Sequence, residues 1–179
     1  MSETIKKIQP DEIEAESFRI IADELGPTGF RPEEFAVVQR VIHATGDFSF
    51  ADTLGFSADA FHAARSAIIG GRNILTDVNM VAAGVSGNIL AKWGGRVVCK
   101  VADSEVAERA KKEGKTRSEV AIELGMPDNV GIVAIGNAPT ALLKIIELIE
   151  AGTIAKPDLV VGVPVGFVNA AESKELLSL

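Results

Sequence analysis

Arg40 and His43 are the residues of this chain whose types and spacing first suggest acid–base chemistry. They lie in the segment 40–47, Arg-Val-Ile-His-Ala-Thr-Gly-Asp, which ends a predicted amphipathic helix. Side chains three apart are neighbours on a helix, and the apolar residues of this helix fall on the opposite arc. An imidazole titrates near neutral pH, so it can both donate and accept a proton. One histidine is a weak signal, and this helix alone favours a solvated polar face.

The other residues with reactive side chains form no catalytic or metal-binding pattern. His62, the second of two histidines, lies among helix-forming residues and is expected to be a helix-surface or capping residue. The single cysteine, Cys99, lies in an apolar run and is expected to be a small buried side chain. One cysteine cannot form an internal disulfide, which is typical of a reducing compartment. We therefore expect no metal site, and the sequence carries no nucleotide-binding fingerprint.

Length, charge and composition limit the class of protein. The chain has 179 residues, of which 47% are hydrophobic, which suits one domain with a full core and argues against disorder. A net charge of −7, no tyrosine and one tryptophan, Trp93, argue against binding to nucleic acid or an anionic membrane. No apolar run approaches the ~20 residues of a membrane span, and the polar N-terminus contains no signal segment. We expect a soluble, cytoplasmic protein.

Hydrophobic periodicity predicts a helical N-terminal third followed by an α/β region. Helices are expected over 10–25, 31–46 and 57–70, with Ser57 as the N-cap of the third. The segment 47–56 is expected to be either an irregular lid or a short extended piece. Short apolar runs then alternate with amphipathic helices, and the runs are 74–77, 96–103, 130–135 and 159–163. This alternation is typical of a parallel sheet covered on both faces. We predict an α/β fold with a mostly parallel sheet of four buried strands, helices on both faces and a single domain, 1–179.

A ligand is expected at the carboxyl ends of the predicted strands, as in other open α/β sheets. One of these ends carries Asp77, and another carries Gly-Asn-Ala-Pro-Thr at 136–140. The helix that starts there offers free N-terminal amides, which suit a carboxylate or a phosphate. The segment 115–118, Lys-Thr-Arg-Ser, starts another helix. A simple turn from strand to helix would also explain the segment 136–140. A capped helix start with surface charge would explain 115–118. The pattern alone favours these two interpretations without a ligand.

Taken together, five segments of the chain resemble the precorrin-8X methylmutase family, which includes the cobalt-precorrin-8 methylmutases. They occur in the family's order with similar gaps and span the chain from about Ser17 to its end. The segments are 40–46 (RVIHATG), 74–77 (ILTD) with Met80 and Val81, 116–118 (TRS), 136–142 (GNAPTAL) and 164–174 (PVGFVNAAESK). Each segment is weak alone, whereas five in register are specific.

The resemblance implies an isomerase of cobalamin biosynthesis. Such an enzyme moves a methyl group from carbon eleven to carbon twelve of precorrin-8X or cobalt-precorrin-8, which gives hydrogenobyrinic acid or cobyrinic acid. No external cofactor is implied, because the conjugated system of the substrate supplies the electrons. The resemblance also implies a homodimer with sites near the subunit interface.

The resemblance also assigns roles to residues of this chain. His43 would act as general acid and base, since a proton given to the macrocycle eases the methyl shift and is then taken back. Arginine suits the peripheral carboxylates of the substrate through its paired donors. Backbone amides of 136–140 would contribute as well. The side chains expected to hold the substrate are those of Ser17, Arg40, Thr45, Thr116, Arg117, Ser118 and Asn137.

One departure from the family concerns the end of the sequence. The family usually continues past Lys174 with a further strand and a basic, glycine-rich segment that is absent here, which bears on stability and turnover. Two alternative functions stay open beside the methylmutase. One is a corrinoid-binding protein without catalysis, and the other is an unrelated α/β protein that binds a phosphorylated metabolite at 136–140.

Overall fold

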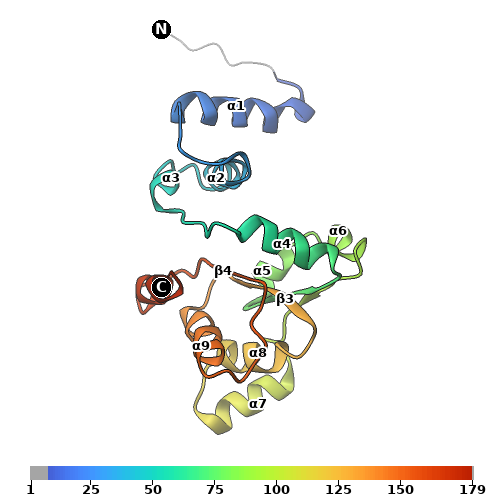
Figure 1. The fold of residues 1–179 in the computed structure, drawn as a ribbon. Coiled ribbons are helices and arrows are strands. Elements are labelled where there is room, and N and C mark those ends of the chain that lie inside the picture. Colours follow the sequence, from blue (N-terminus) through green and yellow to red (C-terminus); the bar gives the residue numbers. More distant parts are fainter. Residues whose placement is uncertain (1–7, 179) are drawn as a thin grey trace. The chain divides into compact units, whose positions relative to one another are not determined.

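The structure, a computed structural model, describes residues 8–178 and divides into two compact units. The first unit extends to Ala58 and is helical, and the second begins at Asp59 and is α/β (Figure 1). The predicted fold class, including its helical N-terminal third, is confirmed. That both units form one domain stays a prediction.

The N-terminal unit is a helical hairpin with a short additional helix. Its core consists of Ile21, Val38 and Ile42, surrounded by phenylalanines. The additional helix, α3, is a single turn within the segment 47–56, for which no helix was expected. The elements are η1 (Pro10–Glu12), α1 (Ile13–Leu25), α2 (Pro32–Thr45) and α3 (Phe50–Thr53).

Both ends of α2 have clear local causes. Pro32 takes the first helical position, where its missing N–H removes no helix bond. The carboxylate of Glu34 accepts the backbone N–H of Arg31 at 2.8 Å, which satisfies a donor at the helix start. Gly46 ends the helix in the left-handed region, with φ 69°, where glycine carries no steric cost. This C-terminal stop places His43 in the last turn.

The second unit contains a four-stranded, all-parallel sheet with the order β2-β1-β3-β4. The two central strands pair in register, with Ile74 opposite Ile132 and Thr76 opposite Ala134. The strands are β1 (Asn73–Thr76), β2 (Val97–Val98), β3 (Val130–Ile135) and β4 (Leu159–Gly162). The predicted parallel sheet is confirmed.

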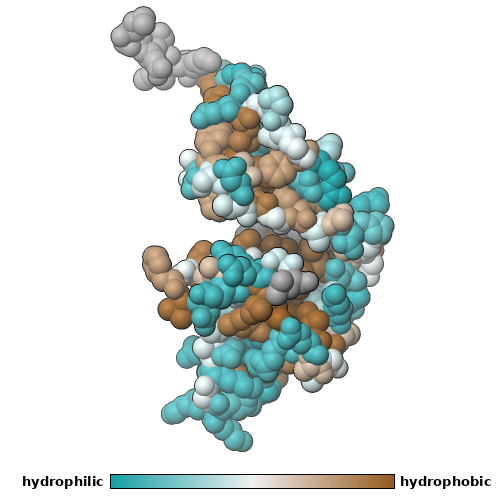
Figure 2. All heavy atoms as spheres, turned by 60° about the vertical axis from the view of Figure 1, so that its left-hand side comes forward, coloured by the Kyte–Doolittle hydropathy of each residue, from teal (hydrophilic) through white to brown (hydrophobic). Residues whose placement is uncertain are grey.

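Two of the predicted strands differ from the expected buried runs in length or in burial. β2 has two residues instead of the run 96–103, because the chain turns at Lys100, whose carbonyl accepts the N–H of Asp103 at 2.9 Å. β4 is not buried, because it lies at the edge of the sheet, and Val161 is 40% exposed. Hydrophobic residues are visible at the surface in Figure 2. Among the residues after β4, the side chains of Val163, Val165 and Phe167 are exposed.

Helices cover both faces of the sheet, as predicted (Figure 1). On one face lie α4 (Ala60–Ile69), α5 (Asn79–Gly84) and α6 (Gly87–Ala91), and on the other lie α7 (Ser104–Glu113), α8 (Arg117–Gly125) and α9 (Pro139–Glu150). The last helix, α10 (Ala170–Leu177), packs against α9. α4 begins at Ala60 and not at Ser57, because the Ala58 carbonyl accepts from the Arg31 guanidinium at 2.8 Å instead of from a helix amide.

The main core of the second unit lies between the sheet and the helices α8 and α9. It is built from fully buried aliphatic side chains, among them Leu75, Ile122, Val133, Ile135, Leu142 and Ile145. Gly125 of α8 lies directly against Leu75 of β1, where any Cβ would overlap the leucine side chain. Trp93, just after α6, is half exposed. In the part of the chain that the structure describes, no helix has the length and apolar character needed to cross a bilayer.

Candidate active site

The N-terminal unit brings Ser17 and His43 into contact. The Oγ of Ser17, on α1, lies 2.7 Å from the Nδ1 of His43, in the last turn of α2. The two helices pack through Ile21, one turn after Ser17, and through Ile42, the residue before His43. The hydrophobic core of the hairpin therefore sets the distance between the two polar side chains, although 26 positions separate them in the sequence.

Phe18 holds the side chains of both His43 and Arg40. Its ring meets the imidazole edge-on, with centroids 5.4 Å apart and planes at 84°. The guanidinium carbon of Arg40 lies 5.2 Å from the centroid of the same ring, at cation–π distance. Gln39 donates a hydrogen bond to the Phe18 carbonyl at 3.0 Å. The polar face of α2 is therefore more than a solvated surface, because it lies against α1.

Arg40 and Thr45 differ in how strongly they are engaged. Arg40 pairs with Glu14 at 3.1 Å, but both side chains are more than half exposed, so the pair is weak. The Thr45 hydroxyl donates to the Val41 carbonyl at 2.8 Å and accepts the N–H of Asp47 at 3.2 Å. In the structure Thr45 thus closes the helix, and its predicted contact with substrate stays a prediction.

The second unit places Thr116 beside the start of α9. Thr116 caps α8 by accepting the N–H of Glu119 at 3.2 Å, while the Glu119 carboxylate accepts the N–H of Thr116 at 2.7 Å. The hydroxyls of Thr116 and Thr140 lie 3.1 Å apart. Because α9 follows β3 directly, this contact brings the first turns of α8 and α9 together at the carboxyl end of the sheet.

Arg117 differs from the neighbouring cations in having no carboxylate partner. Within residues 8–178 its exposed guanidinium forms no ion pair or hydrogen bond, and Ser118 beside it is half-buried. By contrast, Lys115 lies 2.7 Å from Glu113 and 2.9 Å from Glu123. Arg117 is therefore available for an external anion.

A network of ion pairs connects the three helices on this face of the sheet. Arg109 and Lys115 share Glu113 and Glu123, and Lys144 of α9, which is 7% exposed, lies 3.7 Å from Glu123. Hydrogen bonds from Lys115 and then Arg109 lower the pKa of Glu113 from 4.5 to about 2. The network fixes α7, α8 and α9 relative to one another and so positions the residues that follow Lys115.

Asp77 occupies the crevice between the carboxyl ends of β1 and β3. Its fully buried carboxylate accepts the N–H groups of Gly136, Asn137 and Ala138 at 3.1, 2.9 and 2.6 Å. Of the amides expected to be free for an anion, those of Gly136, Asn137 and Ala138 are therefore not free, because a carboxylate of the protein already binds them. Pro139, the next residue, has no N–H. The main support for a phosphate site at 136–140 is therefore lost.

The bonds of Asp77 also fix the loop that carries Asn137. Gly136 packs against Val81, where a Cβ would come within 2.6 Å of a valine methyl carbon. The Asn137 side chain is exposed and forms no hydrogen bond with any described residue. The sequence placed Asp77 at a strand end, but its role depends on β1 and β3 being neighbours in the sheet.

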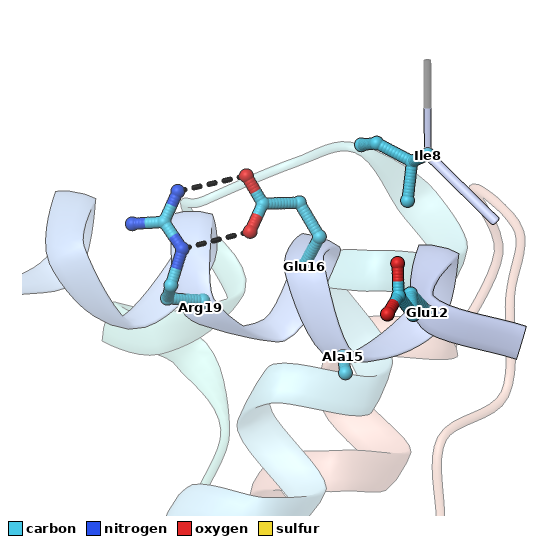
Figure 3. A pocket seen from close by; sticks show the side chains of 5 residues that line it. All are labelled: Ile8, Glu12, Ala15, Glu16 and Arg19. Atoms are coloured by element: carbon cyan, nitrogen blue, oxygen red, sulfur yellow. Dashed lines mark hydrogen bonds and ion pairs between the residues drawn. The ribbon is translucent and has the colours of Figure 1, made fainter. Parts of the chain in front are cut away.

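The remaining features of the described chain add no second site of this kind. An open depression on α1 is lined by Ile8, Glu12, Ala15, Glu16 and Arg19 (Figure 3). Arg19 is already paired there with Glu16 at 2.8 Å. His62 is exposed on α4, as predicted, whereas Cys99 is half-buried instead of buried because the short β2 ends before it. Residues 8–178 contain no group of three His, Cys, Asp or Glu that could hold a metal ion.

Comparison with known proteins shows which family the chain belongs to. The family model of precorrin-8X methylmutase matches residues 12–179. The cobalt-precorrin-8 methylmutase of Priestia megaterium is 45% identical over 172 residues, which are 96% of this chain and 76% of that protein. The precorrin-8X methylmutase of Pseudomonas aeruginosa is 43% identical over 164 residues, or 91% of this chain and 78% of that protein.

A solved structure agrees with the sequence matches. The precorrin-8x methyl mutase of Thermus thermophilus has a TM-score of 0.83 and 44% identity, and the match covers 94% of this chain and 81% of that one. The similarity thus extends over both the helical hairpin and the α/β unit. This chain belongs to the precorrin-8X methylmutase family.

Proposed function

We propose that this chain is an isomerase of cobalamin biosynthesis, which moves a methyl group of precorrin-8X or cobalt-precorrin-8 from carbon eleven to carbon twelve. The product is hydrogenobyrinic acid or cobyrinic acid. The observation that carries the proposal is the exposed imidazole of His43, held in place by Ser17 and Phe18 in a chain of this family.

His43 acts as the general acid and the general base. Protonation makes the conjugated macrocycle electron-deficient, and the methyl group then moves to the adjacent carbon with its bonding electron pair. The same histidine takes the proton back, so the reaction consumes no proton and needs no external cofactor. General acid–base catalysis of this kind contributes about 10²- to 10⁴-fold to the rate.

Each of the two units, taken by itself, carries exposed groups proposed to contact the substrate. Its carboxylates pair with the guanidinium groups of Arg40 and Arg117, which are exposed. Polar side chains complete the contacts, and these are Thr45, Thr116, Ser118 and Asn137, whereas Ser17 contacts His43. The ligand class is thus an anionic corrinoid. Because the protein has a net charge of −7, its binding site for such a ligand needs local positive charge.

Replacing the proposed acid tests the function. We expect His43→Ala to bind hydrogenobyrinic acid, followed through its visible spectrum, and to isomerise substrate about 10²- to 10⁴-fold more slowly than the unsubstituted protein. His62→Ala, which changes the exposed histidine of α4, should do both at the normal rate. An unchanged rate for His43→Ala would exclude His43 as the acid. Tight binding without conversion by the unsubstituted protein would indicate a corrinoid-binding protein without catalysis.

The assembly and the location belong to the same proposal. A homodimer with sites near the subunit interface rests on the family resemblance, and sedimentation equilibrium tests it, since a monomer at all concentrations would contradict it. The cytoplasm is the proposed compartment, supported by a composition with a single cysteine.

A further inference from the structure

We propose that Ser17 is a positioning residue whose hydroxyl accepts the Nδ1–H of His43 and so keeps Nε2 as the nitrogen that transfers the proton. The catalytic part of this inference rests on the proposed function. The position of the ring proton does not, because it can be measured without substrate.

The geometry of the hairpin fixes the imidazole through α1. Ser17 lies 2.7 Å from Nδ1, and the ring of the next residue, Phe18, meets the imidazole edge-on. Phe18 is tied back to α2 by the bond from Gln39 to its carbonyl. In the described chain Nδ1 is engaged, whereas Nε2 has no partner. The nitrogen turned away from α1 is therefore the one that can reach a ligand.

Reversible proton transfer by His43 requires one direction of the hydrogen bond between Ser17 and His43. In the imidazolium both ring nitrogens carry hydrogen, so Nδ1 must donate, and the Ser17 Oγ is the acceptor at its position. After Nε2 has given its proton away, Nδ1–H still donates to the same oxygen. The hydrogen bond of one nitrogen sets the protonation state of the other. Nε2 is thus left bare and ready to take the proton back.

A hydrogen bond in the opposite direction, from the Ser17 hydroxyl to Nδ1, would prevent reversible proton transfer through Nε2. If Ser17 donated to Nδ1, the proton of the neutral ring would lie on Nε2, and no bare nitrogen would face the substrate. The ring would then have to exchange both protons in every cycle. Accepting the Nδ1–H avoids this exchange, which is a role distinct from a direct contact between Ser17 and the substrate.

The nitrogen that carries the proton can be observed directly by ¹⁵N NMR. The sequence has only two histidines, so His62→Gln leaves one imidazole spectrum. At alkaline pH, where the imidazole is neutral, we expect Nδ1 to be protonated with Ser17 present. Ser17→Ala should populate the Nε2–H form, and Ser17→Thr, which keeps a hydroxyl, should restore Nδ1–H. Protonation at Nε2 in the serine protein, or an unchanged ratio in Ser17→Ala, would overturn the proposal.

Activity separates positioning from substrate binding. We expect Ser17→Ala to lower the single-turnover rate roughly 10- to 100-fold, as for other partners that orient a functional histidine. Its Kd for hydrogenobyrinic acid should stay within about twofold, and Ser17→Thr should recover most of the rate. Lost affinity at an unchanged rate would assign Ser17 to the substrate and reject the proposal. If the unsubstituted protein converts no substrate, the proposed function fails, while the NMR result still decides the role of Ser17.

Discussion

At the scale of single residues, Arg117 is a candidate for ligand binding because its guanidinium has no partner among the described residues. Among the described residues its guanidinium has no partner, while Arg109, Lys115 and Lys144 are all committed to glutamates. A guanidinium without a carboxylate partner can pair with an anion from outside the chain. Its position next to the Thr116 cap fixes the backbone from which it extends.

Replacing Arg117 should weaken corrinoid binding and leave stability unchanged. A hydrogen bond to a charged group contributes about 1.5–3 kcal/mol, so Arg117→Ala should raise the Kd for hydrogenobyrinic acid roughly 10- to 100-fold. Arg117→Lys should lie in between, because an ammonium keeps the charge but not the paired donors. The measurement is a spectral titration. Arg65→Ala, an exposed arginine of α4 on the other face of the sheet, is the matched control, and an equal loss there would contradict a specific role for Arg117.

Asp77 is predicted to matter for stability more than for contact with substrate. Asp77→Asn keeps one acceptor oxygen but turns an NH₂ group toward backbone N–H groups, so we expect a loss of about 1–3 kcal/mol in the free energy of unfolding. Urea denaturation measures it. Asp103→Asn, an exposed acid after β2 whose side chain makes no cap bond, should change the stability by less than about 0.5 kcal/mol. Equal effects would show that burial of the Asp77 carboxylate is unimportant.

Single residues of the site were predictable to different degrees. The sequence and the family resemblance identified Ser17, Arg40 and His43, and the structure brings them together around Phe18. The role of Asp77 could not be predicted, because its three partners lie about sixty positions later and become neighbours only through strand pairing. The same pairing places a carboxylate on three of the amides that were expected to be free.

At the scale of elements, the ion-pair network links stability to pH. The pKa of Glu113 is about 2 in the folded chain against an ordinary 4.5, because Lys115 and Arg109 donate to its carboxylate. A carboxylate with a lowered folded pKa stabilises the protein above its unfolded pKa, and this contribution is lost as the pH falls. The loss should therefore occur between about pH 4.5 and pH 2.

Replacing Glu113 should remove this part of the acid sensitivity. We expect the Tm of Glu113→Gln to be below that of the unsubstituted protein at neutral pH and to fall less steeply between about pH 4.5 and pH 2. Circular dichroism melts at a series of pH values measure both. Glu108→Gln changes an exposed glutamate of the same helix without an ion pair in the described chain and serves as the control. Parallel Tm curves for all three proteins would contradict the prediction.

The elements themselves were predictable where local signals are strong. The run 130–135 and the helix after it appear as β3 and α9, and the capped helix expected at 115–118 is confirmed as α8, with Thr116 as its cap. The predicted length of β2 was too great, because apolar composition does not reveal where a chain leaves the sheet. The start of α4 was also wrong, since a guanidinium 27 positions earlier takes the carbonyl of Ala58.

At the scale of the molecule, the strand order decides where function can reside. The order β2-β1-β3-β4 reverses the direction of chain progression between β1 and β3, which is the usual place for a ligand in an open α/β sheet. Asp77 fills the innermost part of that crevice. The residues proposed to bind an anion, Arg117 at the start of α8 and Asn137 just before α9, are exposed outside that crevice. The sequence predicted the class of sheet, but it contains no local signal for this order.

The position of Trp93 has a spectroscopic consequence. It is the only indole chromophore, the chain has no tyrosine, and six of the eight phenylalanines lie in the helical hairpin unit. Intrinsic emission excited near the red edge of absorption therefore reports on the α/β unit alone, while far-ultraviolet ellipticity reports on both. Coincident melting curves from the two signals are expected for a single domain. An ellipticity change that precedes or follows the emission change would instead reveal a hairpin that melts on its own.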